Sequence, residues 1–223
     1  KGTFTGIGQD NDDSFIGEFF FFGKFFFGAE AIVSFFPDTD LDMLTNSIQR
    51  YKPITTEKIE ILPDGTIPTV EMTSLGFQES LNPYEITQAE IACVLKGGAF
   101  VTEKNVFERV ITNIKDGAVI GYKYFDFGED NSSETMEFAA EVVGLGTDST
   151  IHILIDGEDG EEIGTCTIGR DSGIVKTLVK KVTGRHSLFF KVTTGYSEGE
   201  YGWMAGYFEG RPLFELKNFV FMK

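Results

Sequence analysis

The stretch ITNIKDGAVIGYKYFDF, residues 111–127, decides the fold. Two runs rich in Val, Ile, Tyr and Phe, 111–114 and 118–127, favour β-strands, and the Asp-Gly pair between them favours a tight turn. The pattern repeats along the chain, which predicts further strands at 135–143, 151–155, 163–168, 174–182, 187–192 and 213–222. Short strands separated by turns at intervals of about 8–12 residues are typical of a β-sandwich. We therefore predict an all-β fold almost without helix.

The charge composition of the chain argues against some classes of binding partner. The 223 residues carry 19 basic and 35 acidic side chains, for a net charge of −16. A field of that sign repels phosphate backbones and anionic lipid, so neither nucleic acid nor membrane is an expected partner. The two cysteines, Cys93 and Cys166, have no Cys or His at metal-ligand spacing, and we expect both to be buried as small hydrophobic residues.

The first 81 residues have a different sequence pattern from the rest of the chain. Residues 19–27 contain seven phenylalanines around a Gly-Lys pair, which predicts a hairpin buried on both faces. In water such a hairpin would aggregate, so we expect Phe19–Phe27 to be covered by further polypeptide or by self-association. A second hairpin is predicted with strands at 58–62 and 67–70 around Asp64-Gly65.

Motifs for catalysis or metal binding are weak. The acidic run 38–42 has Met43 and Gln49 where a calcium loop needs Gly and Glu. His152 and His186 lie near no nucleophile motif, so no catalytic residue and no metal ligand is assigned. Aromatic residues are more informative, because Tyr201, Trp203 and Tyr207 share one predicted loop, 195–211, and such rings could stack on sugars. The alternative is that they close the end of the sandwich.

Residues 82–223 resemble carbohydrate-binding module family 6. The resemblance rests on Asn82-Pro83-Tyr84 and on the stretches 113–117, 121–128, 156–164, 182–188 and 213–216, in that order. It implies a jelly-roll β-sandwich that binds polysaccharides such as xylan, often with a structural calcium. At three binding positions of that family this chain has Val119, Ile174 and Glu215, and Lys217 replaces an aspartate associated with calcium.

Residues 1–81 resemble the end of a glycoside hydrolase family 43 catalytic domain, through the stretches 1–3, 8–11, 23–24 and 64–67. That family is a five-bladed β-propeller acting on arabinose- or xylose-containing polymers. At about 40–50 residues per blade, 81 residues span at most two blades. The blades that carry the family's catalytic acids are missing from this chain, so its standing as an enzyme is left open.

Together these interpretations predict a partial β-propeller at 1–81 and a sandwich at 82–223, in a secreted or extracellular carbohydrate-active protein. The expected site uses Tyr201, Trp203, Tyr207 and Glu215 to bind a polysaccharide or oligosaccharide. No cofactor is assigned; in place of calcium we expect Lys217 to pair with Glu90. The alternative is a structural or assembly protein that uses the sandwich and the Phe-rich segment as interaction surfaces.

Overall fold

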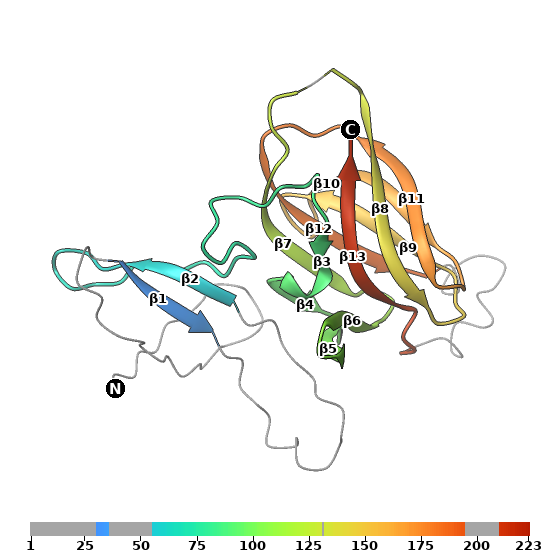
Figure 1. Cartoon of the computed structure of the whole chain (residues 1–223), viewed down its shortest axis with the longest axis horizontal. Coiled ribbons are helices and arrows are strands. Elements are labelled where there is room, and N and C mark those ends of the chain that lie inside the picture. Colours follow the sequence, from blue (N-terminus) through green and yellow to red (C-terminus); the bar gives the residue numbers. More distant parts are fainter. Residues whose placement is uncertain (1–29, 36–54, 131, 195–209) are drawn as a thin grey trace, which may run out of the picture.

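The computed structural model describes residues 30–35, 55–130, 132–194 and 210–223. Within them the chain forms strands and one short 3-10 helix (Figure 1). The elements are β1 (Glu30–Phe35), β2 (Thr55–Glu60), β3 (Thr87–Gln88), η2 (Ala89–Ile91), β4 (Val94–Lys96), β5 (Phe100–Asn105), β6 (Glu108–Ile114), β7 (Val119–Asp126), β8 (Thr135–Gly144), β9 (Ser149–Ile155), β10 (Glu161–Ile168), β11 (Gly173–Lys180), β12 (Arg185–Thr193) and β13 (Phe214–Met222). The prediction of an all-β fold is confirmed.

Two antiparallel sheets make the sandwich. One has the strand order β10-β9-β12-β7-β4, and the other has β11-β8-β13-β6-β5 with the short β3 also paired to β13. The sheets face each other in Figure 1, with neighbouring strands of one sheet often far apart in the sequence. This is the predicted jelly-roll arrangement.

The core between the sheets is dominated by aromatic rings. Phe219 of β13 lies 4.9 Å from Tyr122 and 5.0 Å from Phe190, measured between ring centroids, and both pairs meet edge to face. This geometry is favourable because the electron-poor edge of one ring meets the electron-rich face of the other. The Tyr122 hydroxyl donates to the Ala89 carbonyl at 3.0 Å, and complete burial raises its pKa well above the usual value. Cys93 and Cys166 are free and buried, as predicted.

The part before the sandwich is a two-stranded sheet of β1 and β2, paired from Glu30↔Glu60 to Phe35↔Thr55. The predicted turn at Asp64-Gly65 is present, since Leu62 N donates to Thr66 O at 2.9 Å. The predicted second strand at 67–70 is wrong, because β2 pairs with β1 instead. Pro63 and Pro68 lack the N–H groups that a paired strand supplies. The Phe19–Phe27 hairpin lies outside the described residues.

Residues 71–81 join β2 to the sandwich. Glu57 of β2 is 7% exposed and accepts hydrogen bonds from Thr73 N at 2.7 Å and Thr73 Oγ1 at 2.9 Å. Ser74 N donates to Lys123 O at 2.7 Å, and Leu81 bridges to Phe125. Burial raises the pKa of Glu57, although the bonds from Thr73 oppose the shift. The desolvated Glu57 carboxylate thus fastens the first sheet to a segment that lies beside β7.

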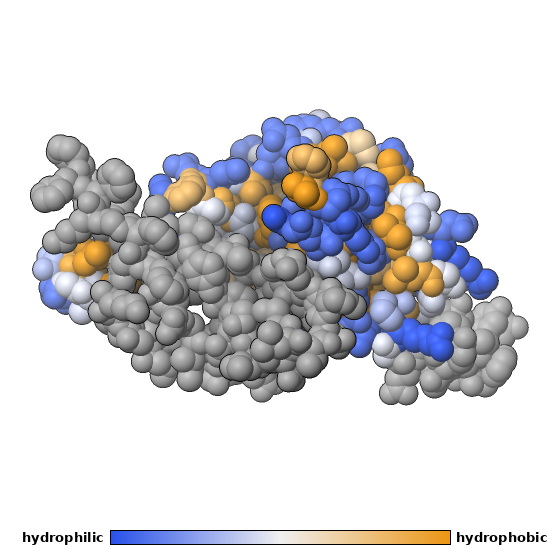
Figure 2. Space-filling model, turned by 60° about the horizontal axis from the view of Figure 1, so that its bottom comes forward, coloured by the Kyte–Doolittle hydropathy of each residue, from blue (hydrophilic) through white to orange (hydrophobic). Residues whose placement is uncertain are grey.

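In Figure 2 the coloured part of the surface shows both hydrophilic regions and patches of hydrophobic residues. The most exposed large hydrophobic side chains of the described residues are Phe107 and Val106, 97% and 80% exposed at the β5–β6 turn. In the described segments, no helix has the length and apolar character needed to cross a membrane.

Candidate functional site

Glu215 is the one predicted site residue that the structure describes. It lies near the start of β13, where its Oε1 accepts hydrogen bonds from Lys104 Nζ of β5 at 2.8 Å and from Thr112 Oγ1 of β6 at 2.7 Å. Its exposed fraction is only 7%, so the carboxylate is held between two donors with little freedom. Both of these contacts use Oε1.

The three aromatic site residues, Tyr201, Trp203 and Tyr207, lie outside the described residues. The described chain stops at Thr194 after β12 and resumes at Gly210 before β13. Leu213 N donates to Ile114 O at 2.8 Å, which places the approach to β13 beside the end of β6. The described residues just before β13 thus lie at the same end of the sandwich as Glu215.

Two other positions singled out from the family pattern lie in different surroundings. Val119 is buried in a small cluster with Leu154 and Phe189, outside the main core. Ile174 is 69% exposed on β11, an edge strand of the other sheet. Neither side chain has the ring or the polar group with which a saccharide is commonly held, so the structure leaves Glu215 as the polar member of the set.

The predicted ion pair between Lys217 and Glu90 is wrong. Lys217 Nζ lies 2.7 Å from Glu108 Oε1 and 3.3 Å from Glu141 Oε1, and Asn218 Nδ2 donates to Glu141 Oε2 at 2.8 Å. Since β13 lies between β8 and β6, its outward side chains meet partners on both neighbours. The hydrogen bond to Lys217 holds the pKa of Glu108 below its usual range.

The calcium that the resemblance implies can be tested against these residues. Calcium takes six to eight oxygen ligands, several of them carboxylates. Glu90 does offer Oε2, which is buried without a hydrogen-bond partner. Within the described segments, however, no group of three or more Asp, Glu, His or Cys side chains gathers, and the ammonium of Lys217 occupies the place of the aspartate. The residues that the structure describes around Glu90 and Lys217 therefore do not fit a calcium site.

Both histidines make two hydrogen bonds that tie strands together. His186 Nδ1 lies 2.7 Å from Asp156 Oδ2, and its Nε2 donates to Thr183 O at 2.9 Å. His152 Nδ1 lies 2.7 Å from Glu162 Oε2 of β10, and its Nε2 lies 2.8 Å from Thr193 Oγ1 of β12. These contacts link the turn after β9 and three adjacent strands.

Comparison with solved structures gives the wider setting. The chain is similar to a glycoside hydrolase family 43 arabinoxylan arabinofuranohydrolase from Bacillus subtilis, with 23% identity and a TM-score of 0.54, over 76% of this chain and 34% of that one. It is similar to a family 6 carbohydrate-binding module from Clostridium cellulolyticum in complex with xylose, with 22% identity and a TM-score of 0.52, over 64% of this chain and all of that one.

A third similar structure is a β-1,3-glucan-binding family 6 module from Bacillus halodurans, with 20% identity and a TM-score of 0.51, over 65% of this chain and all of that one. At these identities the likeness shows the fold alone. No curated protein matches the sequence. The family model for carbohydrate-binding module family 6 matches residues 88–205, more than half of the chain. The chain therefore belongs to carbohydrate-binding module family 6.

Proposed function

We propose that the chain binds xylan or arabinoxylan and is attached to the end of a secreted glycoside hydrolase of arabinofuranosidase or xylosidase type. The observation that carries the proposal is the family match over residues 88–205. The similar module from Clostridium cellulolyticum is in complex with xylose, which supports a xylose-based ligand.

Attachment to a hydrolase is supported by the extent of one similarity. The arabinofuranohydrolase aligns with 76% of this chain, whereas the isolated modules align with 64–65% of it. The longer match includes residues outside the sandwich, as a shared arrangement of propeller and module requires. This chain spans only 34% of that enzyme. We expect the 223-residue chain by itself to release no reducing sugar.

The proposed binding residues are Glu215, Tyr201, Trp203 and Tyr207. Lys104 and Thr112 orient the Glu215 carboxylate through Oε1, so Oε2 is the acceptor for a sugar hydroxyl. An acceptor on a side chain that is already held in place loses little entropy on binding. The aromatic rings supply faces for the C–H groups of a sugar ring.

Affinity gel electrophoresis in arabinoxylan, xylan and β-1,3-glucan gels tests the proposal. We expect retardation in the first two gels, and its loss in Glu215→Gln and Trp203→Ala. Glu137→Gln is the matched control, since Glu137 lies on β8 of the same sheet and pairs with Lys176. Absence of retardation in all three gels would favour the structural or assembly protein instead.

A further inference from the structure

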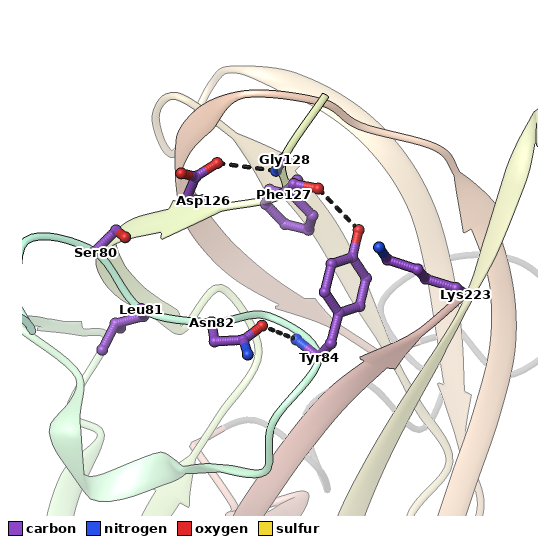
Figure 3. A pocket seen from close by; sticks show the side chains of 8 residues that line it. All are labelled: Ser80, Leu81, Asn82, Tyr84, Asp126, Phe127, Gly128 and Lys223. Atoms are coloured by element: carbon purple, nitrogen blue, oxygen red, sulfur yellow. Dashed lines mark hydrogen bonds between the residues drawn. The ribbon is translucent and has the colours of Figure 1, made fainter. Parts of the chain in front are cut away.

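A pocket of about 280 Å³ lies at the end of the sandwich away from Glu215 (Figure 3). Glu215 is the second residue of β13 and Lys223 follows its last residue, so eight residues at about 3.3 Å each separate them by about 26 Å. The pocket therefore cannot be part of the site around Glu215. Its lining residues are Ser80, Leu81, Asn82, Tyr84, Asp126, Phe127, Gly128 and Lys223.

The lining is apolar at the base and polar around the rim. Leu81 and Phe127 are almost fully buried, and the half-buried Tyr84 is fixed because its hydroxyl donates to Phe127 O at 3.0 Å. On the rim, Asp126 Oδ1 accepts from Gly128 N at 2.9 Å, and Asn82 Oδ1 accepts from Tyr84 N at 3.0 Å. An apolar base with a polar rim suits a ring that carries hydroxyl groups.

The rim also has opposite charges on opposite sides. Figure 3 places the Asp126 carboxylate across the pocket from the Lys223 ammonium. Lys223 Nζ lies 4.6 Å from the Tyr84 ring centroid and 4.0 Å from Asp130 Oδ2, the outer limit of an ion pair. The Asp126 side of the rim can thus accept hydrogen bonds from hydroxyl groups. The opposite side offers the ammonium of Lys223, whose ion-pair partner Asp130 lies at the outer distance limit.

A second cation stands behind Tyr84. Lys181 is only 9% exposed, donates to the Tyr84 hydroxyl at 3.2 Å, and lies 5.5 Å from the ring centroid. Among the described residues, no carboxylate lies within 4 Å of its ammonium. Asp130 interacts with Lys181 electrostatically, although not within 4 Å, so Lys181 has no close counter-ion and would attract an anion bound beside Tyr84.

We propose that this pocket binds a uronic acid residue of a polysaccharide. The hydroxyl edge of the sugar faces Asp126 and Ser80, its carboxylate faces Lys223 and the field of Lys181, and its ring rests on the apolar base. The inference rests on the proposed function for the saccharide class of the ligand, but it uses separate residues.

Titration of the full chain with sodium glucuronate, followed by amide NMR, tests the inference, with glucose and sodium acetate as matched probes. We expect glucuronate to shift the amide signals of Ser80, Asn82 and Gly128. Lys223→Gln should weaken glucuronate binding about tenfold, the value of one charge-assisted hydrogen bond. Lys176→Gln, which removes an exposed lysine of β11, should leave it unchanged.

The outcomes separate this inference from the proposed function. Glucuronate shifts near Gly128 in a chain that no xylan gel retards would support the pocket and refute the main site. Equal shifts with acetate would overturn the inference, because a bare carboxylate would suffice. Equal shifts with glucose, or equal effects of the two lysine variants, would overturn it as well.

Discussion

The sandwich and the β1–β2 sheet are held in place by different means. The sandwich encloses a continuous cluster of buried side chains, in which three further aromatic rings, Phe125, Phe138 and Phe190, contact Tyr122 or Phe219. The β1–β2 sheet is tied to the following segment by one buried carboxylate, Glu57, and two donors of Thr73. Apolar burial therefore distributes the stability of the sandwich over many residues. The attachment of the β1–β2 sheet depends instead on the hydrogen bonds of Glu57, whose strength changes when the carboxylate is protonated.

The largest effect is expected in the sandwich core. Phe219→Ala should lower its free energy of unfolding by about 3–5 kcal/mol, because the cavity removes contacts with several rings. Denaturant unfolding followed by circular dichroism measures the change. Phe107→Ala, at a side chain 97% exposed, is the control and should cost less than about 0.5 kcal/mol. A loss below about 1 kcal/mol for Phe219→Ala would contradict this account of the core.

A smaller and more local loss of stability is expected where Glu57 of the β1–β2 sheet bonds to Thr73. Glu57→Ala leaves Thr73 N and Oγ1 without their acceptor, a change worth about 1–3 kcal/mol for buried groups. Hydrogen exchange at the Thr73 amide should accelerate, while the melting midpoint of the sandwich should stay the same. Glu60→Ala, at an exposed position of the same strand, should do neither. Equal destabilisation of both regions would show that they unfold as one unit.

A still smaller effect is expected from pH. Burial raises the pKa of Glu57 above 4.5, so the folded state holds this proton more tightly than the unfolded state. The stability linked to Glu57 is then fully present below pH 4.5 and is lost as the pH rises through the raised pKa. The opening free energy at the Thr73 amide should be lower at pH 7 than at pH 4.5, and Glu57→Gln should remove this dependence. An increase towards pH 7 would refute the sign.

No effect is expected from chelation. Lys217 and its two glutamates occupy the outer face of β13, where the family pattern has a calcium-associated aspartate. The thermal midpoints of both regions should be the same with and without EDTA. A drop of several degrees that calcium reverses would contradict the assignment and point to Glu90, whose Oε2 is buried without a partner.

The sequence predicted the long strands well, since β6 to β13 overlap the expected runs. Successive side chains of these strands point to opposite faces of a sheet, and the strands end at turns that contain Gly. Both features can be recognised from residues that are neighbours in the sequence. β3, β4 and β5 were not predicted, because two of them have only two or three residues and the β5–β6 turn carries exposed Val106 and Phe107 in place of typical turn residues. β1 pairs with β2 across a long connection, which local patterns do not reveal.

The site was harder to predict than the fold. The ion-pair partners of Lys217 depend on which strands flank β13. The family pattern suggested Glu90 as the partner but did not show that β6 and β8 lie on either side of β13. The sequence did not predict the pocket, because the residues around it are far apart along the chain. Tyr84 and Lys181 are about a hundred residues apart, Lys181 and Lys223 are about forty residues apart, and the three share no motif. The pairing of β3 with β13 and the bond from Phe221 N to Pro83 O bring Tyr84 close to Lys223.

That pairing has a consequence for how the sandwich can be rearranged. Phe221 N donates to Pro83 O at 2.9 Å, so the strand that begins the sandwich and the strand that ends it lie side by side. A short linker could join residue 223 to residue 82, and the exposed turn at Val106 and Phe107 could be cut to make new ends. The sandwich should therefore accept circular permutation, with the original ends joined beside the pocket and the new ends at the β5–β6 turn.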